Sequence, residues 1–317
     1  MTPTLTHANL VAPGIYCIDT GFVREQFDAS YLLLDDRSVA FIDTGTNYSV
    51  PRFLKTLQEL NISVEQVQYI ILTHVHLDHA GGAGLLMQAC PNAQLVVHPR
   101  GARHMIDPTA LRAGAVGVYG EEIVQESYGE LQPIDASRVM EVGEGAELKL
   151  GERILHILDT PGHAKHHIAI WDPLSRGVFT GDTFGLSYRE FDTDIGPFIM
   201  PTTTPIQFDP EALKDSVERI SALAPVCLFP THYSRVDGVD RLKRLFLDQL
   251  NEIVSLARSL QTESNRHELL KLGMAKIHIK YLKSIGCKMN DEQIIDFLRI
   301  DLELNAQGIG HWLNQTT

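Results

Sequence analysis

The chemically most informative segment of the chain covers residues 73–82 and has the sequence THVHLDHAGG, directly after an apolar run. Alternate residues of an extended chain point to the same side, so His74 and His76 converge. Asp78 and His79 follow where a helix is expected to begin, and they point in another direction. The two glycines at the end allow a tight turn of the backbone. This segment can therefore offer two pairs of ligands to two adjacent metal ions.

Three residues of the same kinds occur later, each shortly after an apolar run: His163, Asp182 and His232. Imidazoles and carboxylates suit Zn, Fe or Mn, and the four cysteines lie too far apart in the sequence to form a thiolate site. Two such ions at ~3.5–4 Å can hold a bridging hydroxide, and the pKa of metal-bound water falls towards ~7. Asp78 is the expected catalytic residue, because it can orient the hydroxide and relay a proton to the leaving group. The residues thus indicate a hydrolase.

Other histidines and tyrosines leave alternatives open. We interpret His166 and His167 as neighbours of the ligands or as surface residues. His98 ends an apolar run, and it either faces the site or is an ordinary polar residue. Four tyrosines are candidate hydrogen-bond donors to a substrate oxygen, with a role in the core or in a loop as the alternative: Tyr119, Tyr128, Tyr188 and Tyr233.

The elements that must position these residues alternate between strand and helix. Short apolar runs bounded by turn residues predict strands at 14–18, 30–34, 38–42, 69–72, 94–97, 154–158, 168–171, 177–180 and 226–229. Apolar residues on one face predict helices at 50–60, 80–89 and 210–223. The segment 100–130 has no clear pattern. The alternation predicts a layered α/β catalytic domain over residues 1–235.

Beyond residue 235 the apolar residues follow a helical spacing throughout. Asn265 with Glu268 resembles a capping box, and Asn290 is a candidate cap for a further helix. We therefore expect residues 236–317 to form an all-helical C-terminal extension that packs on the catalytic domain.

The composition excludes some classes of partner. The chain has 317 residues, with 27 Lys and Arg against 40 Asp and Glu, and a net charge of −13. Phosphate binding needs a basic face, so we expect no nucleic-acid partner. No segment resembles a secretory signal or approaches the ~18 apolar residues of a transmembrane helix, which predicts a cytoplasmic protein without membrane contact. The expected partner is a small-molecule substrate, and a homodimer remains an open alternative.

The ligand pattern resembles that of the metallo-β-lactamase superfamily over about residues 10–233, through His74, His76, Asp78, His79, His163, Asp182 and His232. The resemblance implies a four-layer αβ/βα sandwich of class α/β. It also implies a dinuclear site for two divalent metal ions at one edge of the two sheets, with Zn as the first choice and Fe or Mn as alternatives.

The resemblance assigns three ligands to each ion and one between them: His74, His76 and His163 to the first, Asp78, His79 and His232 to the second, and Asp182 as the bridge. It also implies a role for Asp43. This residue is expected to accept a proton from a ligand imidazole and so to fix its tautomer.

Within the superfamily, the main class of zinc β-lactamases carries Cys where this chain has Asp182, and flavodiiron proteins carry Glu in place of His76. Acyl-homoserine lactonases have Tyr where Gly185 stands. The helical tail and the segments 181–185 and 297–304 resemble the glyoxalase II and quinolone-signal response thioesterase-like group, which implies hydrolysis of a small ester or thioester. The alternatives are a phosphodiesterase or lactonase of the same fold, and a regulatory binding protein with a vestigial metallohydrolase site.

Overall fold

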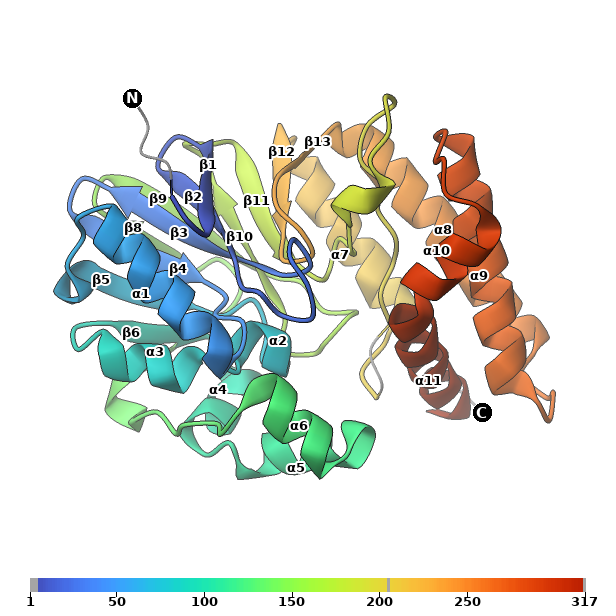
Figure 1. Ribbon diagram of the computed structural model, residues 1–317, viewed down its shortest axis with the longest axis horizontal. Coiled ribbons are helices and arrows are strands. Elements are labelled where there is room, and N and C mark those ends of the chain that lie inside the picture. The colour runs from blue at the N-terminus through green and yellow to red at the C-terminus, as the bar shows by residue number, and fades with distance from the viewer. Residues whose placement is uncertain (1–4, 204–205, 316–317) are drawn as a thin grey trace. The chain divides into compact units, whose positions relative to one another are not determined.

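The computed structural model describes residues 5–203 and 206–315 (Figure 1). The described chain divides into two compact units. The first unit lies within residues 1–159, 166–181 and 229–235, and the second within 160–165, 182–228 and 236–317. The division into domains at residues 1–235 and 236–317, with the second packed on the first, stays a prediction.

A seven-stranded sheet belongs to the first unit and has the strand order β1-β2-β3-β4-β5-β6-β7. Its strands are β1 (Ala8–Ala12), β2 (Ile15–Asp19), β3 (Ala29–Asp35), β4 (Ser38–Ile42), β5 (Val67–Ile71), β6 (Gln94–Val97) and β7 (Val139–Glu141). Neighbours from β1 to β4 pair antiparallel, whereas β4 to β7 pair in parallel. The parallel half brings the carboxyl ends of β4 and β5 to the same edge.

A six-stranded sheet has the order β13-β12-β11-β10-β9-β8. Its strands are β8 (Glu147–Leu150), β9 (Arg153–Asp159), β10 (Ile168–Asp172), β11 (Gly177–Gly181), β12 (Cys227–Pro230) and β13 (Val236–Asp237). The pairs β8–β9, β9–β10, β10–β11 and β12–β13 are antiparallel. All nine predicted strands are present in the two sheets, and β1, β7, β8 and β13 were not predicted.

Aromatic side chains of the first unit fill the space between the two sheets. The ring centroid of Tyr31 on β3 lies 5.2 Å from that of Phe179 on β11 and 5.6 Å from that of Phe229 on β12. The rings of Phe179 and Phe229 stack at 4.7 Å. The hydroxyl of Tyr31 donates to the carbonyl of Pro230 at 2.5 Å, which satisfies the polar atom that this ring carries into the aromatic layer.

Helices cover the other face of the seven-stranded sheet (Figure 1). Side chains alternate along a strand, so Leu32 and Phe41 point to this face, where they pack with Phe53 and Leu57 of α1. The helices of the first unit are α1 (Val50–Glu59), α2 (Leu77–Ala80), α3 (Ala83–Ala89), α4 (Pro99–Ile106), α5 (Thr109–Tyr119) and α6 (Glu121–Tyr128). The predicted helix at 80–89 is thus divided into two, and the unassigned segment 100–130 is helical.

The second unit contributes the remaining helices: α7 (Pro210–Ala222), α8 (Val239–Ser259), α9 (Arg266–Ser284), α10 (Asp291–Phe297) and α11 (Arg299–Gln315). Asn290 caps α10 as predicted, because its side chain accepts from the N–H of Gln293. The capping box predicted at Asn265 and Glu268 is wrong, since Asn265 lacks the extended backbone that directs a cap side chain at the helix and makes no capping bond. Within the described ranges, no helix is both long enough and apolar enough to span a bilayer.

Candidate metal centre

The site of the first unit begins where the neighbouring parallel strands β4 and β5 end. The N–H of Asp43, the first residue after β4, donates to the carbonyl of Ile71 at 2.8 Å. Asp43 has a φ of +57°, which turns its side chain back under the segment that follows β5. The N–H of Thr73 donates to Oδ1 of Asp43 at 2.8 Å. The sheet register therefore joins Asp43 to the start of the histidine-rich segment.

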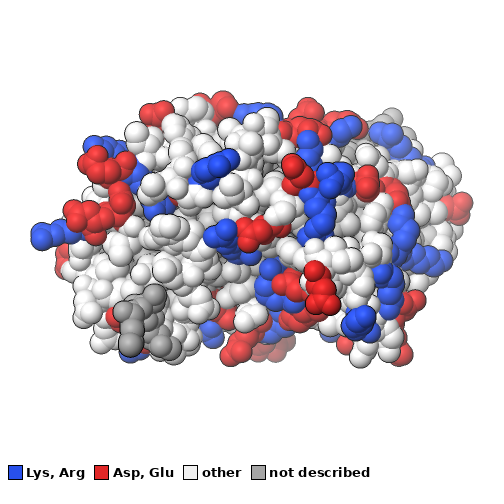
Figure 2. Space-filling view, turned by 90° about the horizontal axis from the view of Figure 1, so that it is seen from above, with Lys and Arg blue, Asp and Glu red and all other residues white. Residues whose placement is uncertain are grey.

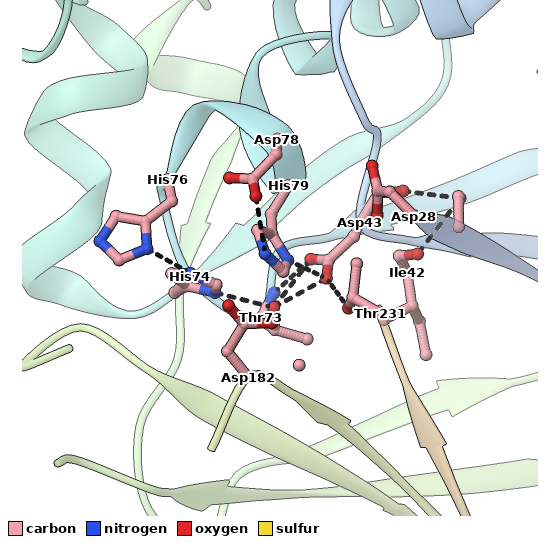
Figure 3. Close-up of polar contacts among 12 residues, drawn as sticks. Asp28, Ile42, Asp43, Thr73, His74, His76, Asp78, His79, Asp182 and Thr231 are labelled. Atoms are coloured by element: carbon pink, nitrogen blue, oxygen red, sulfur yellow. Dashed lines mark hydrogen bonds and ion pairs between the residues drawn. The ribbon is translucent and has the colours of Figure 1, made fainter. Parts of the chain in front are cut away.

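Asp43 is the hub of a buried hydrogen-bond network (Figure 3). Its Oδ2 accepts from the hydroxyls of Thr73 and Thr231 and from Nδ1 of His79, each at 2.8 Å. We assign the Nδ1–H tautomer to His79, because Nδ1 faces a carboxylate oxygen at hydrogen-bond distance, which accepts from an N–H. The lone pair of Nε2 is then directed away from Asp43, so the expected role of Asp43 in fixing a ligand imidazole agrees with this geometry.

Three candidate ligand atoms converge on the side of the His79 ring that faces away from Asp43: Nε2 of His79, Oδ2 of Asp78 and Nε2 of His232. Oδ2 of Asp78 lies 3.8 Å from Nε2 of His79 and 3.4 Å from Nε2 of His232. Nδ1 of His232 donates to the carbonyl of Phe27 at 3.0 Å, so this imidazole also turns the lone pair of Nε2 towards Asp78. The three ligand atoms lie within 4.8 Å of one another. Two neutral imidazole nitrogens and one carboxylate oxygen in this arrangement fit a divalent metal ion.

His74 and His76 meet beside this group. Nε2 of His74 lies 2.7 Å from Nδ1 of His76, while Nδ1 of His74 faces the hydroxyl of Thr73 at 3.2 Å. The convergence predicted from their alternate positions is confirmed. His74 is fully buried and His76 is half-buried, so the pair lies at the border between the protein core and solvent.

His163 and Asp182 come together within the second unit. Nε2 of His163 lies 3.4 Å from Oδ2 of Asp182. The hydroxyl of Thr183 donates to the carbonyl of Thr160 at 2.9 Å, which ties the two short segments to each other. Gly162 is required beside His163, because its φ is +126° and an added Cβ would lie 2.3 Å from the backbone of α7.

The other histidines have different roles. The ring of His167 stacks on His74 with centroids 4.9 Å apart, and Nδ1 of His166 accepts from the N–H of Val75 at 3.4 Å, so both are neighbours of the candidate ligands. Burial lowers the pKa of His166 to about 3, which keeps its ring neutral. His98 caps α4 by accepting from the N–H of Arg100 at 3.0 Å.

The four candidate tyrosines also have different surroundings. Tyr188 is buried in the second unit, where its hydroxyl donates to Asp301 at 2.9 Å, so it has a structural role. Tyr233 is also buried, and its burial raises the pKa of its hydroxyl. Tyr119, the last residue of α5, and Tyr128, the last residue of α6, have ring centroids 6.4 Å apart.

Sequence reasoning missed three contributors to this site: Thr73 and Thr231, which donate to Asp43, and Phe27, which holds His232. A signal for the threonines is present in the sequence, because each directly precedes a candidate ligand histidine. Nothing in the sequence around Phe27 marks its carbonyl as the acceptor for a residue 205 positions away.

Known proteins that are similar to this chain point to one family. The family model of the metallo-beta-lactamase superfamily matches residues 23–232. A metallo-beta-lactamase fold-containing protein of Sulfurisphaera tokodaii is 27% identical over 217 residues, which are 67% of this chain and 75% of that protein. Hydroxyacylglutathione hydrolase 1 of Vibrio vulnificus is 29% identical over 152 residues, which are 48% of this chain and 45% of that enzyme.

Solved structures show the same fold. The crystal structure of a metallo-beta-lactamase superfamily protein from Sulfolobus tokodaii matches with a TM-score of 0.65 and 22% identity, over 93% of this chain and 98% of that one. A family protein from Thermus thermophilus matches with a TM-score of 0.62 and 20% identity, over 91% and 94% of the two chains. The predicted αβ/βα sandwich with C-terminal helices is confirmed. The chain therefore belongs to the metallo-beta-lactamase superfamily, whose members are generally metal-dependent hydrolases.

Proposed function

We propose that the protein is a dinuclear metal-dependent hydrolase of a small ester or thioester. One observation carries the proposal: two imidazole Nε2 atoms and one carboxylate oxygen converge, and each imidazole has its Nδ1–H engaged on the opposite side. Such preorganised, neutral ligands suit a catalytic metal more than a purely structural network. The similarity to a hydroxyacylglutathione hydrolase supports an acyl substrate, although the aligned part covers less than half of that enzyme.

The proposed ligands are the seven of the family pattern: His74, His76 and His163 for one ion, Asp78, His79 and His232 for the other, and Asp182 between them. Two features support the assignment of Asp182. It follows Gly181 directly at the end of β11, and a Cβ added to Gly181 would lie 2.7 Å from the hydroxyl of Thr73, which precedes the first ligand histidine. We propose Zn for both positions, with Fe or Mn as alternatives, because the donors are nitrogen and oxygen.

Two divalent ions at these residues would supply a water of lowered pKa and a Lewis acid for the substrate carbonyl. The chain itself supplies orientation and a path for the proton. Asp43 and the carbonyl of Phe27 hold the rings of His79 and His232, so the ligand atoms need little reorganisation when substrate binds. The carboxylate of Asp78 is 26% exposed, so one oxygen can accept a proton and pass it to the leaving group.

A substrate screen tests the proposal. Protein reconstituted with Zn, Fe or Mn is offered acyl thioesters, esters, lactones and aryl phosphodiesters at equal concentration. We expect thioesters or esters to be hydrolysed fastest, and Asp78→Asn to lower that rate by about 10²–10⁴-fold. A rank order led by phosphodiesters or lactones would support another hydrolase of the same fold. Uniform inactivity of the metal-loaded protein would favour a regulatory binding protein with a vestigial site.

The remaining expectations concern partners and location. On the face shown in Figure 2, basic and acidic side chains are interspersed. We propose a small molecule as the partner, with no nucleic acid and no membrane surface. The cytoplasmic location and the homodimer stay predictions that fractionation and sedimentation can test.

A further inference from the structure

A row of aromatic rings leads from α5 to His232 within the first unit. The ring centroids of Tyr119 and Tyr128 are 6.4 Å apart, those of Tyr128 and Phe22 are 5.5 Å apart, and those of Phe22 and Phe27 are 5.9 Å apart. Phe27 then meets the ring of His232 edge-on at 5.1 Å. We call Phe22, Phe27, Tyr119 and Tyr128 the aromatic row. Its last contact is therefore a candidate metal ligand.

The aromatic row packs on buried residues, but most of its rings are partly exposed to solvent. Leu77 of α2 and Val124 of α6 are buried beneath it, together with most of Tyr128. Phe22, Phe27 and Tyr119 are only half-buried, and no residue of α5 is buried. Partly exposed aromatic rings in a continuous array are unfavourable in water, and they are typical of surfaces that bind an apolar group.

The charges around the aromatic row also limit what it binds. Burial and the neighbouring charge of Asp78 raise the pKa of Tyr119 to about 12, and they raise that of Tyr128 further. Both hydroxyls therefore stay protonated and uncharged at neutral pH. Asp78 places a negative charge near the two tyrosines, while Arg24 lies over the ring of Phe27 at 5.0 Å. The charges of Asp78 and Arg24 have opposite signs, so the uncharged rings decide the preference. A neutral aliphatic chain can pack on them, whereas a chain that ends in a carboxylate would lose hydration there.

We propose that the aromatic row binds the apolar part of the substrate, so that the enzyme selects uncharged acyl groups with a medium-length aliphatic chain. This inference rests on the proposed ester or thioester hydrolysis and deepens it. The continuity of the row with His232 and Asp78 supports the assignment, because an acyl chain on the rings would leave its carbonyl beside the ligand atoms.

The test uses acyl thioesters of N-acetylcysteamine, whose leaving group is small and polar, with acetyl, butanoyl, octanoyl and adipoyl chains. A fully buried methylene contributes about 0.8 kcal/mol, or about 4-fold. Because the row is half open, we expect kcat/KM to rise by at least about 10-fold from acetyl to octanoyl. The adipoyl chain, which ends in a carboxylate, should be slower than butanoyl.

Variants of the row and a matched control separate its effect from that of folding. Phe22→Ala should reduce the octanoyl preference to less than about 3-fold, and Phe22→Leu, which keeps most of the packing volume, should reduce it in part. Ile123→Ala is the control, because Ile123 is apolar, 53% exposed and on the same hairpin but outside the row. It should leave the preference unchanged. Thermal melting of each variant confirms that it is folded.

Calorimetry with octanoate and acetate gives a readout that does not depend on turnover. Wild-type protein should bind octanoate more tightly than acetate, with a negative heat-capacity change that Phe22→Leu diminishes. Failure to hydrolyse any ester or thioester would reject the proposed function. The calorimetric preference for octanoate over acetate would still show whether the aromatic row binds an aliphatic chain. Hydrolysis with equal rates for acetyl and octanoyl, a faster adipoyl substrate, or an octanoyl preference kept in folded Phe22 variants would overturn the inference.

Discussion

Replacing Asp43 by asparagine tests how the ligand imidazole of His79 is oriented. Oδ1 of Asp43 accepts from the backbone N–H of Thr73, and Oδ2 accepts from His79 and from two threonine hydroxyls. The side-chain amide of asparagine offers one acceptor oxygen and one NH2 group. The donors that faced one of the two carboxylate oxygens would therefore face the NH2 group, which is itself a donor. The backbone N–H cannot change, whereas hydroxyls rotate and an imidazole can move its proton. We therefore expect the amide NH2 to face His79.

The consequence for the metal ligands follows from the tautomer. With an NH2 group at 2.8 Å, Nδ1 of His79 must accept, so the proton moves to Nε2. This N–H then points to Asp78, where the lone pair is needed for the metal. Loss of such an orienting partner costs about 10–100-fold in metal affinity, or about 1.4–2.7 kcal/mol. The altered buried hydrogen bonds should also lower the free energy of unfolding by about 1–3 kcal/mol.

Metal affinity is measured by competition with a chromophoric chelator, and stability by denaturant unfolding of the metal-free protein. Asp172→Asn is the matched control, because Asp172 is also fully buried but pairs with Arg153 at 2.8 Å, away from the ligands. It should lose stability while keeping its metal affinity. An Asp43→Asn protein that is folded and binds metal within about twofold of wild type would refute the tautomer argument, since losing an orienting partner should weaken metal binding by at least about 10-fold.

Three further predictions concern other parts of the chain. Asp182→Ala should lose bound metal and activity together, because the proposed bridging ligand would hold both ions; elemental analysis that still finds two ions per chain would contradict the bridging role. Gly181→Ala should lower stability by about 1–3 kcal/mol in denaturant unfolding, since its φ is +47° and the new Cβ would lie 2.5 Å from Nε2 of His167. Burial lowers the pKa of His278 from 6.5 to about 4, so between these pH values the unfolded chain binds a proton that the folded protein does not. Wild-type stability should therefore be complete above pH 6.5 and fall by about 3 kcal/mol towards pH 4, and His278→Leu should flatten that part of the profile.

The sequence predicted the central strands well because both of their faces are buried. The runs at 30–34 and 38–42 correspond to β3 and β4, where continuous apolar residues leave little ambiguity. The helix α5 was missed because its residues other than Arg112 are mostly apolar or small on all sides, and Gly114 and Gly117 interrupt the pattern. The short strand β8 alternates between exposed and buried residues over only four positions, which is too short for a period to be recognised.

The sequence by itself identified the candidate donor atoms of the site and their order along the chain. The spacing of His74, His76, Asp78 and His79 at the end of a strand is a local property. The geometry of this short backbone segment is therefore enough to predict which of their side chains converge. Tertiary structure decided which ring nitrogen each imidazole presents. His79 depends on Asp43, 36 positions away, and His232 depends on the carbonyl of Phe27, 205 positions away. Hydrogen-bond partners so distant in sequence are set by sheet register and loop packing, and no local pattern encodes them.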